Sequence, residues 1–110
     1  MKTYDDLLKF VQKAERDSFG FHKLSKDVAL HIYEGKRQVN VCVMDRNDFP
    51  ISVLNLIFDP SGRTVSAFDV KNGVAQYDRP VELKMDDAIT KDSIKFVMNK
   101  SWIVPTLQAL

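Results

Sequence analysis

A histidine and the single cysteine are the first residues to consider for chemistry. In the hairpin predicted below, His31 and Cys42 lie diagonally across two neighbouring strands. A Cys–His pair can supply a nucleophile and its base, or half of a zinc site. The other histidine, His22, falls in a predicted loop, and no third ligand is fixed by spacing. The favoured interpretation is therefore a half-buried thiol beside a surface imidazole.

Aspartates near predicted turns are candidates for a carboxylate site. Asp45 and Asp48 share one loop, but their spacing lacks the alternating ligands and the glycine of a calcium-binding loop. Asp59 is better explained as a turn residue. Asp69 falls on a strand face with Val65, where a carboxylate lies at the sheet rim in water or has a shifted pKa. The rim position is the favoured one.

Several basic side chains would form a positive edge if the predicted loops converge. Together with Tyr33, they would resemble a stacking platform for single-stranded nucleic acid. Acidic residues are scattered through the same region, however, and the formal net charge is only +1. Ordinary solvated turns are therefore favoured, and nucleic acid is an unlikely partner. The basic residues are Lys23, Lys26, Lys36, Arg37 and Arg46.

Motifs that mark common enzymes are missing from the sequence. It contains no glycine-rich phosphate loop, no dinucleotide fingerprint, no G-x-S-x-G elbow and no H-E-x-x-H motif. Three of the 4 glycines, Gly35, Gly62 and Gly73, are needed by predicted hairpin turns. We therefore predict no catalytic residue, no bound cofactor and no metal site.

Length and composition indicate one α+β domain over residues 1–110. The 45% hydrophobic and 28% charged content is ordinary for a globular protein. Because Cys42 is the single cysteine, an intrachain disulfide is excluded and a reducing, cytoplasmic setting is favoured. The first residues lack the apolar core of a secretory signal, and no apolar run reaches membrane-spanning length. No membrane partner is expected.

The N-terminal residues predict an amphipathic helix from Thr3 to about Asp17. Thr3 is a suitable N-cap, and Gly20 is a plausible helix stop. Phe19 and Phe21 flank that glycine and are expected to anchor the exit from the helix to the core. Apolar residues recur at helical spacing on one face. They are Tyr4, Leu7, Leu8, Val11 and Ala14.

Residues 28–34 and 39–43 predict a β-hairpin, because apolar and other residues alternate in both runs. A two-residue Gly35-Lys36 turn of type II′ would pair the inward-facing residues of the two strands. The predicted pairs are Ile32 with Val39, Leu30 with Val41, and Val28 with Val43. The outer face is polar to mixed. It carries His31, Tyr33, Asn40, Cys42 and Met44.

Residues 51–70 contain the densest apolar run and predict a central hairpin. Asp59-Pro60-Ser61-Gly62 is a turn signal, and a three-residue loop from Pro60 to Gly62 sets Asp59 opposite Arg63. This register places Leu54 opposite Phe68, Leu56 opposite Ser66 and Phe58 opposite Thr64. Ile51, Val53 and Ile57 would share the second face of the first strand. A strand that is apolar on both faces needs a cover on each side.

The rest of the chain predicts a further hairpin, a short strand and a helix. Asn72-Gly73 suits a type I′ turn that sets Val70 opposite Ala75 and Phe68 opposite Tyr77. A last strand is predicted from the alternation of Val81, Leu83 and Met85, and a C-terminal helix is predicted to begin after Thr90. Pro105 disfavours helix at Val104. The predicted fold is α+β: an N-terminal helix, an antiparallel meander sheet of five or six strands, and a C-terminal helix.

We predict a small cytoplasmic protein-interaction module: an adaptor, inhibitor or regulatory subunit. Methionine and aromatic residues are enriched at interfaces, and the C-terminal tail is unusually apolar for a chain end. The tail has two open interpretations, since it either folds back over the sheet or stays available to a partner. A homodimer through that face would satisfy both. The partner-binding candidates are Tyr33, Met44, Trp102, Leu107 and Leu110.

Two alternative functions remain open. The first is a small-ligand-binding domain or minor enzyme, with a pocket between sheet and helix near Asp69, Tyr77 and His31. It predicts thermal stabilisation by a metabolite. The second is weak nucleic-acid binding, which predicts a steep dependence on salt.

Overall fold

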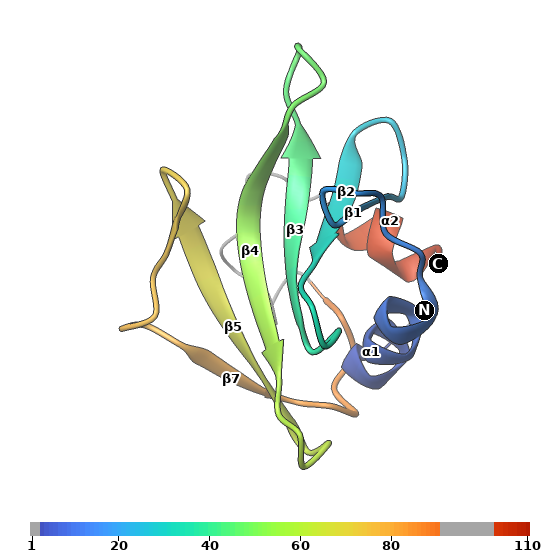
Figure 1. Ribbon diagram of the computed structural model, residues 1–110. Coiled ribbons are helices and arrows are strands. Elements are labelled where there is room, and N and C mark those ends of the chain that lie inside the picture. The colour runs from blue at the N-terminus through green and yellow to red at the C-terminus, as the bar shows by residue number, and fades with distance from the viewer. Residues whose placement is uncertain (1–2, 91–102) are drawn as a thin grey trace.

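The computed structural model describes residues 3–90 and 103–110, which form one antiparallel sheet and two helices (Figure 1). Strands β1 to β5 follow one another as a meander, and β6 and β7 both pair with β5. The predicted α+β fold is confirmed, with seven strands in the described residues instead of five or six. The elements are α1 (Tyr4–Lys13), β1 (Phe21–Lys23), β2 (Val28–Ile32), β3 (Gln38–Met44), β4 (Pro50–Phe58), β5 (Thr64–Lys71), β6 (Val74–Ala75), β7 (Val81–Lys84) and α2 (Ile103–Gln108).

Helix α1 begins as predicted and ends earlier than predicted. The Thr3 hydroxyl accepts from the Asp6 N–H, and the Asp6 carboxylate accepts from the Thr3 N–H, which forms a capping box. The helix ends at Lys13, so Gly20 is not its stop. The Asp17 carboxylate accepts hydrogen bonds from two backbone N–H groups of the following loop. Such local side-chain bonds compete with the backbone bonds of a continuing helix.

The β2–β3 hairpin has the predicted register. Ile32 pairs with Val39 and Leu30 with Val41. The turn is not type II′, because φ is positive at both Gly35 (86°) and Lys36 (55°). The Lys36 ammonium donates to the carbonyls of Gln12 and Ala14, at 3.2 and 3.1 Å. These two bonds place the Lys36 ammonium at the C-terminal end of α1, where the helix dipole favours a cation.

The β4–β5 hairpin differs from its predicted register by one residue. Phe58 pairs with Val65 and Leu56 with Ala67, because the loop contains the four residues 60–63. Two backbone bonds close it, from Asp59 N–H to Thr64 O and from Gly62 N–H to Asp59 O. The wider loop brings Val65 and Ala67 onto the same face as Leu56.

The predicted second apolar face of β4 is wrong, because the strand contains a β-bulge. Val41 pairs with Leu54 but Cys42 pairs with Ser52, which leaves Val53 as the extra residue. Ile51 consequently pairs with Val43 and lies on the opposite face from Ile57. The face away from the helices therefore presents Ser52 in place of a continuous apolar row, and a second apolar cover is not required.

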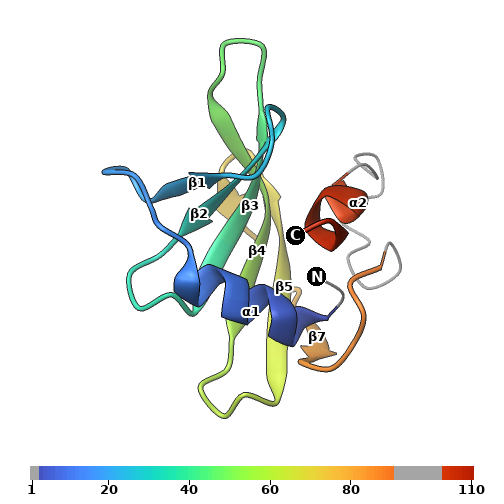
Figure 2. The same ribbon diagram turned by 90° about the vertical axis from the view of Figure 1, so that its right-hand side faces the viewer.

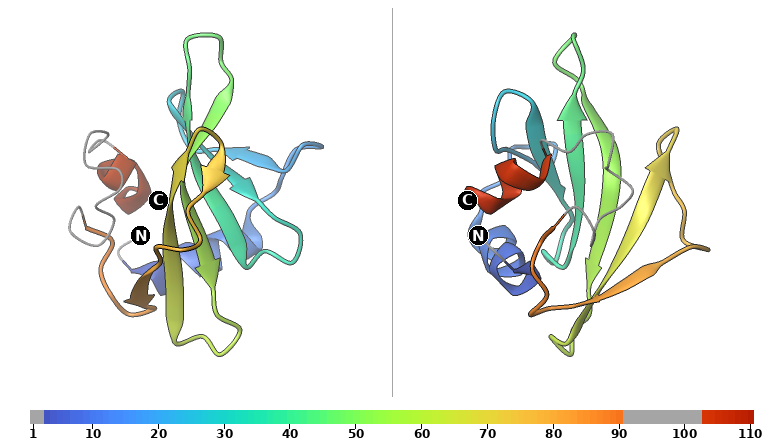
Figure 3. Two further views of the ribbon diagram at one scale, coloured as in Figure 1. Left: turned by 90° about the vertical axis from the view of Figure 1, so that its left-hand side faces the viewer. Right: turned by 180° about the vertical axis from the view of Figure 1, so that it is seen from behind.

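Both helices lie on the same side of the sheet, and their apolar residues form one core with it (Figures 2 and 3). The tail is tucked into this core, since Ile103, Val104 and Leu107 are buried. Pro105 lies within α2, contrary to prediction. A proline is tolerated in the first helical turn, where its missing N–H would have no intrahelical partner. The predicted helical positions from Ile94 to Ser101 lie outside the described residues.

Other corrections concern the ends of strands. The β5–β6 hairpin has the predicted pair Val70–Ala75, with positive φ at Asn72 and Gly73. Strand β6 ends at Ala75, so Phe68 and Tyr77 are not backbone partners, although their ring centroids lie 4.9 Å apart.

On two edge strands of the sheet, an aspartate bonds the outward-facing backbone groups of one residue. Phe21 of β1 donates its N–H to the Asp17 carboxylate, and its carbonyl accepts from the Asp17 N–H. Lys84 of β7 has the same two bonds with Asp87. At each position a single aspartate occupies both backbone groups of the edge residue.

Candidate functional site

The face of the sheet opposite α1 and α2 carries most of the polar strand residues, and we call it the open face. Its members are Ala29, His31, Asn40, Cys42, Met44, Ser52, Asn55, Ile57, Ser66 and Phe68. Asn40, Cys42 and Asn55 are nevertheless buried. Neighbouring side chains on the same face therefore cover them.

His31 and Cys42 are diagonal neighbours, as predicted, but each is engaged elsewhere. The His31 ring lies between those of Phe21 and Tyr33, with centroid distances of 4.7 and 4.8 Å. Cys42 Sγ lies 3.5 Å from Ser52 Oγ. Burial raises the pKa of the Cys42 thiol, and the contact with Ser52 only partly offsets this effect. The thiol therefore lacks the lowered pKa of a nucleophile.

We expect Cys42 of the folded protein to react slowly with a thiol reagent such as dithionitrobenzoate. Only the thiolate reacts, and the raised pKa of Cys42 lowers the fraction of thiolate. Burial also keeps the reagent away from the sulfur. The rate of the reaction, followed by absorbance with and without denaturant, tests this expectation. A rate in the folded protein equal to that in the unfolded protein would contradict it.

A chain of hydrogen bonds joins the polar residues at the centre of the open face. The Asn40 amide group donates to Tyr33 Oη and to Ser52 Oγ, at 3.1 Å in both cases. Asn40 Oδ1 accepts from the amide of Asn55. The buried Asn55 Oδ1 has no hydrogen-bond partner among the described residues. This network holds the Tyr33 ring against His31 and stiffens the middle of the face.

An aromatic hollow of about 550 Å³ lies at one end of the open face. Phe19 and Phe49 at its edge are 79% and 67% exposed, which is unusual for phenylalanine. Ala29 belongs to its lining but is itself only 2% exposed, because neighbouring side chains cover it. We call this site the aromatic hollow. It is lined by Asp17, Phe19, Phe21, Lys23, Ala29, Met44, Asp48, Phe49 and Pro50.

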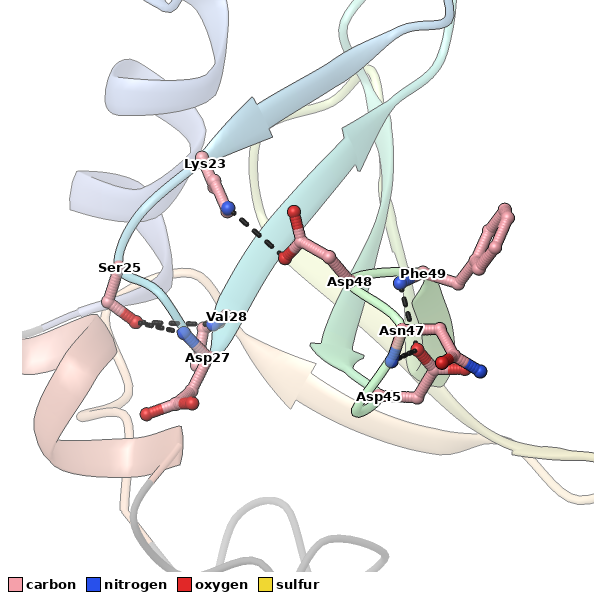
Figure 4. Close-up of polar contacts among 8 residues, drawn as sticks. All are labelled: Lys23, Ser25, Asp27, Val28, Asp45, Asn47, Asp48 and Phe49. Carbon is pink, nitrogen blue, oxygen red and sulfur yellow. Dashed lines mark hydrogen bonds and ion pairs between the residues drawn. The ribbon is translucent and has the colours of Figure 1, made fainter.

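Two loops with the same hydrogen bonds hold the aromatic side chains of the hollow. In the first, Asp17 Oδ1 accepts from the N–H groups of Phe19 and Phe21, both at 2.9 Å. In the second, Asp45 Oδ1 accepts from Asn47 and Phe49, at 2.8 and 2.9 Å (Figure 4). Each aspartate N–H also donates to the carbonyl of the phenylalanine four positions later.

The fourth residue of each loop has positive φ, which is 90° at Gly20 and 61° at Asp48. Gly20 suits this conformation, and a Cβ there would also lie 3.1 Å from the His31 ring. The two loops thus place Phe21 and Phe49 by the same backbone geometry, from positions far apart in the sequence.

An ion pair crosses one side of the hollow. Lys23 Nζ, at the end of β1, lies 3.3 Å from Asp48 Oδ1 in the β3–β4 loop (Figure 4). Both side chains are largely exposed, so the pair contributes little to stability. It does fix charged groups beside the exposed Phe49.

The predicted partner-binding residues lie in different surroundings. Met44 lines the hollow. Tyr33 is outside the lining, but its ring contacts His31, which stacks on Phe21 of the lining. Leu107 is a core residue, 1% exposed, and Leu110 is half-buried against the core. Trp102 lies outside the described residues.

The other candidate residues do not converge on one site. Asp69 pairs with Leu54 on the helix side of the sheet, whereas His31 lies on the open face. The Asp69 side chain is partly exposed and lies 3.9 Å from Lys71. Asp59 is a turn residue whose hydrogen bonds to Ser61 lower its pKa. Of the basic residues, Lys36 binds the end of α1 and Lys23 pairs with Asp48.

Sequence reasoning missed the phenylalanines of the hollow. Neither Phe19 nor Phe21 anchors the chain in the core as predicted: the Phe19 side chain is mostly exposed, and Phe21 stacks on His31 on the open face. The reason is that Asp17 holds the backbone in a loop that turns Phe19 outward. Asp17 to Phe21 and Asp45 to Phe49 share an Asp-x-x-x-Phe spacing, but Asp6 to Phe10, which begins and ends within α1, has the same spacing, as does Asp92 to Phe96. The spacing alone therefore could not have identified the two loops.

Among residues 3–90 and 103–110, no three His, Cys, Asp or Glu side chains are grouped so that they can hold a metal ion. No helix in the same residues is long and apolar enough to span a membrane. Comparisons with protein-family models, with curated proteins and with solved structures found no significant match.

Proposed function

We propose that this protein is a small interaction module that binds a segment of a protein partner in the aromatic hollow. The observation that supports the proposal is the exposure of Phe19 and Phe49 at the edge of a hollow whose lining is mostly apolar. Aromatic residues and methionine are enriched at interfaces, and buried aromatic anchors dominate binding energy.

The rigidity of the hollow supports the same function. Each phenylalanine loop is closed by several backbone hydrogen bonds, and the Phe21 ring stacks on His31. A site that is formed before binding loses less conformational entropy when its partner arrives. As a regulatory or adaptor protein of the cytoplasm, the module would act through this contact alone.

We expect the substitution Ala29→Leu to abolish partner binding. Ala29 lines the hollow but is only 2% exposed, so the added carbon atoms displace the side chains around it and change the shape of the hollow. The control is Ala75→Leu, which makes the same chemical change at a partly buried position on β6, outside the lining of the hollow. Circular dichroism during thermal unfolding checks that both variants fold.

The measurement is affinity co-purification from a lysate of the native host, with mass spectrometry and stoichiometry of the retained proteins. One protein retained in near-equal amounts by the parent and Ala75→Leu, and lost from folded Ala29→Leu, supports the proposal. Equal retention by Ala29→Leu excludes the hollow as the binding surface. A homodimer is a special case, and light scattering would detect it as a doubled mass that Ala29→Leu reduces.

A further inference from the structure

The charges of the aromatic hollow indicate which kind of segment it binds. Its lining contains two carboxylates, Asp17 and Asp48, and one ammonium group, Lys23. Lys23 is paired with Asp48, whereas Asp17 forms no ion pair among the described residues. The lining therefore has a net negative charge and one carboxylate without a counterion.

The aromatic side chains add to this preference. The face of a phenylalanine ring carries negative electrostatic potential and attracts cations. Phe19 and Phe49 present much of their surface to solvent, and Phe21 lines the same hollow. Ring faces and carboxylates thus attract the same kind of group.

We infer that an arginine side chain of the partner segment enters the hollow. This inference rests on the proposed function and specifies the chemistry of the partner. A guanidinium group stacks on aromatic faces, binds carboxylates through several N–H donors and is more weakly hydrated than an ammonium group. Its aliphatic stem would lie along Met44, which is partly exposed in the lining. The Asp17 carboxylate supplies the unpaired negative charge.

The test uses short peptides selected from a random displayed library on the immobilised protein, followed by calorimetric titration of the best peptide. The double variant Asp17→Asn/Asp48→Asn removes both charges and keeps the side-chain oxygens. Asparagine still accepts from the loop N–H groups and tolerates the positive φ at position 48. The matched control is Asp78→Asn, a charge removal at an exposed residue outside the hollow.

We expect the selected peptides to contain arginine. Replacing that arginine with uncharged citrulline, or using the double variant, should weaken binding about tenfold or more, as charge-assisted contacts are lost. Asp78→Asn should bind like the parent. Lys23→Gln should bind the arginine peptide more tightly, because it removes a competing cation from the hollow.

Three outcomes would overturn the inference. Peptides without basic residues that bind equally well to the double variant would show that the hollow takes an apolar side chain, and the proposed function would stand. Selected peptides that carry acidic residues in place of arginine, and that bind more weakly to Lys23→Gln, would show that the hollow selects an acidic segment. Peptide binding that Ala29→Leu leaves unchanged would exclude the hollow itself, and the proposed function would fail as well.

Discussion

Replacing Leu56 with alanine should lower the free energy of unfolding by about 2–5 kcal/mol. Leu56 lies in the middle of β4, between Val39 of β3 and Ala67 of β5, and is fully buried on the helix side of the sheet. Truncation removes buried apolar surface and leaves a cavity between the sheet and its helices. Urea unfolding followed by circular dichroism measures the loss.

The matched control is Ile57→Ala, one residue further along the same strand. Ile57 lies on the open face and is only partly buried, so its truncation leaves a smaller cavity. We expect a loss of about 1 kcal/mol, which is typical of an average substitution. Equal losses at the two positions would show that the open face is packed as tightly as the core.

The substitution Asn40→Val should destabilise the protein by about 2–3 kcal/mol, because it leaves buried polar groups without partners. Asn55 loses the acceptor for its amide group, and its Oδ1 has no partner among the described residues to begin with. Tyr33 and Ser52 lose a donor at the same time. Thermal and chemical unfolding both report the change.

The double variant Asn40→Val/Asn55→Val should recover much of that stability. The two residues pair directly across β3 and β4, and valine suits strand positions. Replacing both members of a buried polar pair removes the unsatisfied groups together. A double-mutant cycle measures the coupling. Additive losses would mean that the asparagines do not act as a pair.

The elements that the sequence predicted correctly are those in which two independent signals agree. In the β2–β3 hairpin, the alternation of apolar residues and the position of Gly35 indicate the same register, and the structure has it. At the start of α1, Thr3 and Asp6 are three residues apart and form the predicted cap as a capping box. Each of these features depends on neighbours in the sequence.

Two of the elements predicted wrongly depend on the local backbone, namely the length of one loop and a bulge in one strand. The loop after Asp59 closes on Thr64, which shifts the β4–β5 register by one residue and exchanges the faces of β5. The bulge at Val53 likewise exchanges the face of Ile51. Apolar alternation cannot indicate either feature when both faces of a strand contain apolar residues.

The hollow was missed because its aromatic residues belong mostly to loops. Phe19 and Phe49 follow neither a helical nor a strand period, and their orientation comes from the carboxylates of Asp17 and Asp45. A single aspartate before a phenylalanine is common, so one occurrence carries little information. The structure brings two such loops to one end of the sheet, and that convergence makes a site.

The aspartates at the sheet edges also bear on the behaviour of the protein at high concentration. An exposed edge residue with free N–H and C=O groups is a template on which another chain can add a strand, and fibrils grow by this addition. Asp17 and Asp87 occupy those groups at Phe21 and Lys84. At these two positions the edge strands therefore offer no free backbone groups to another chain, and the exposed Phe19 lies near an edge residue whose N–H and C=O are already bonded.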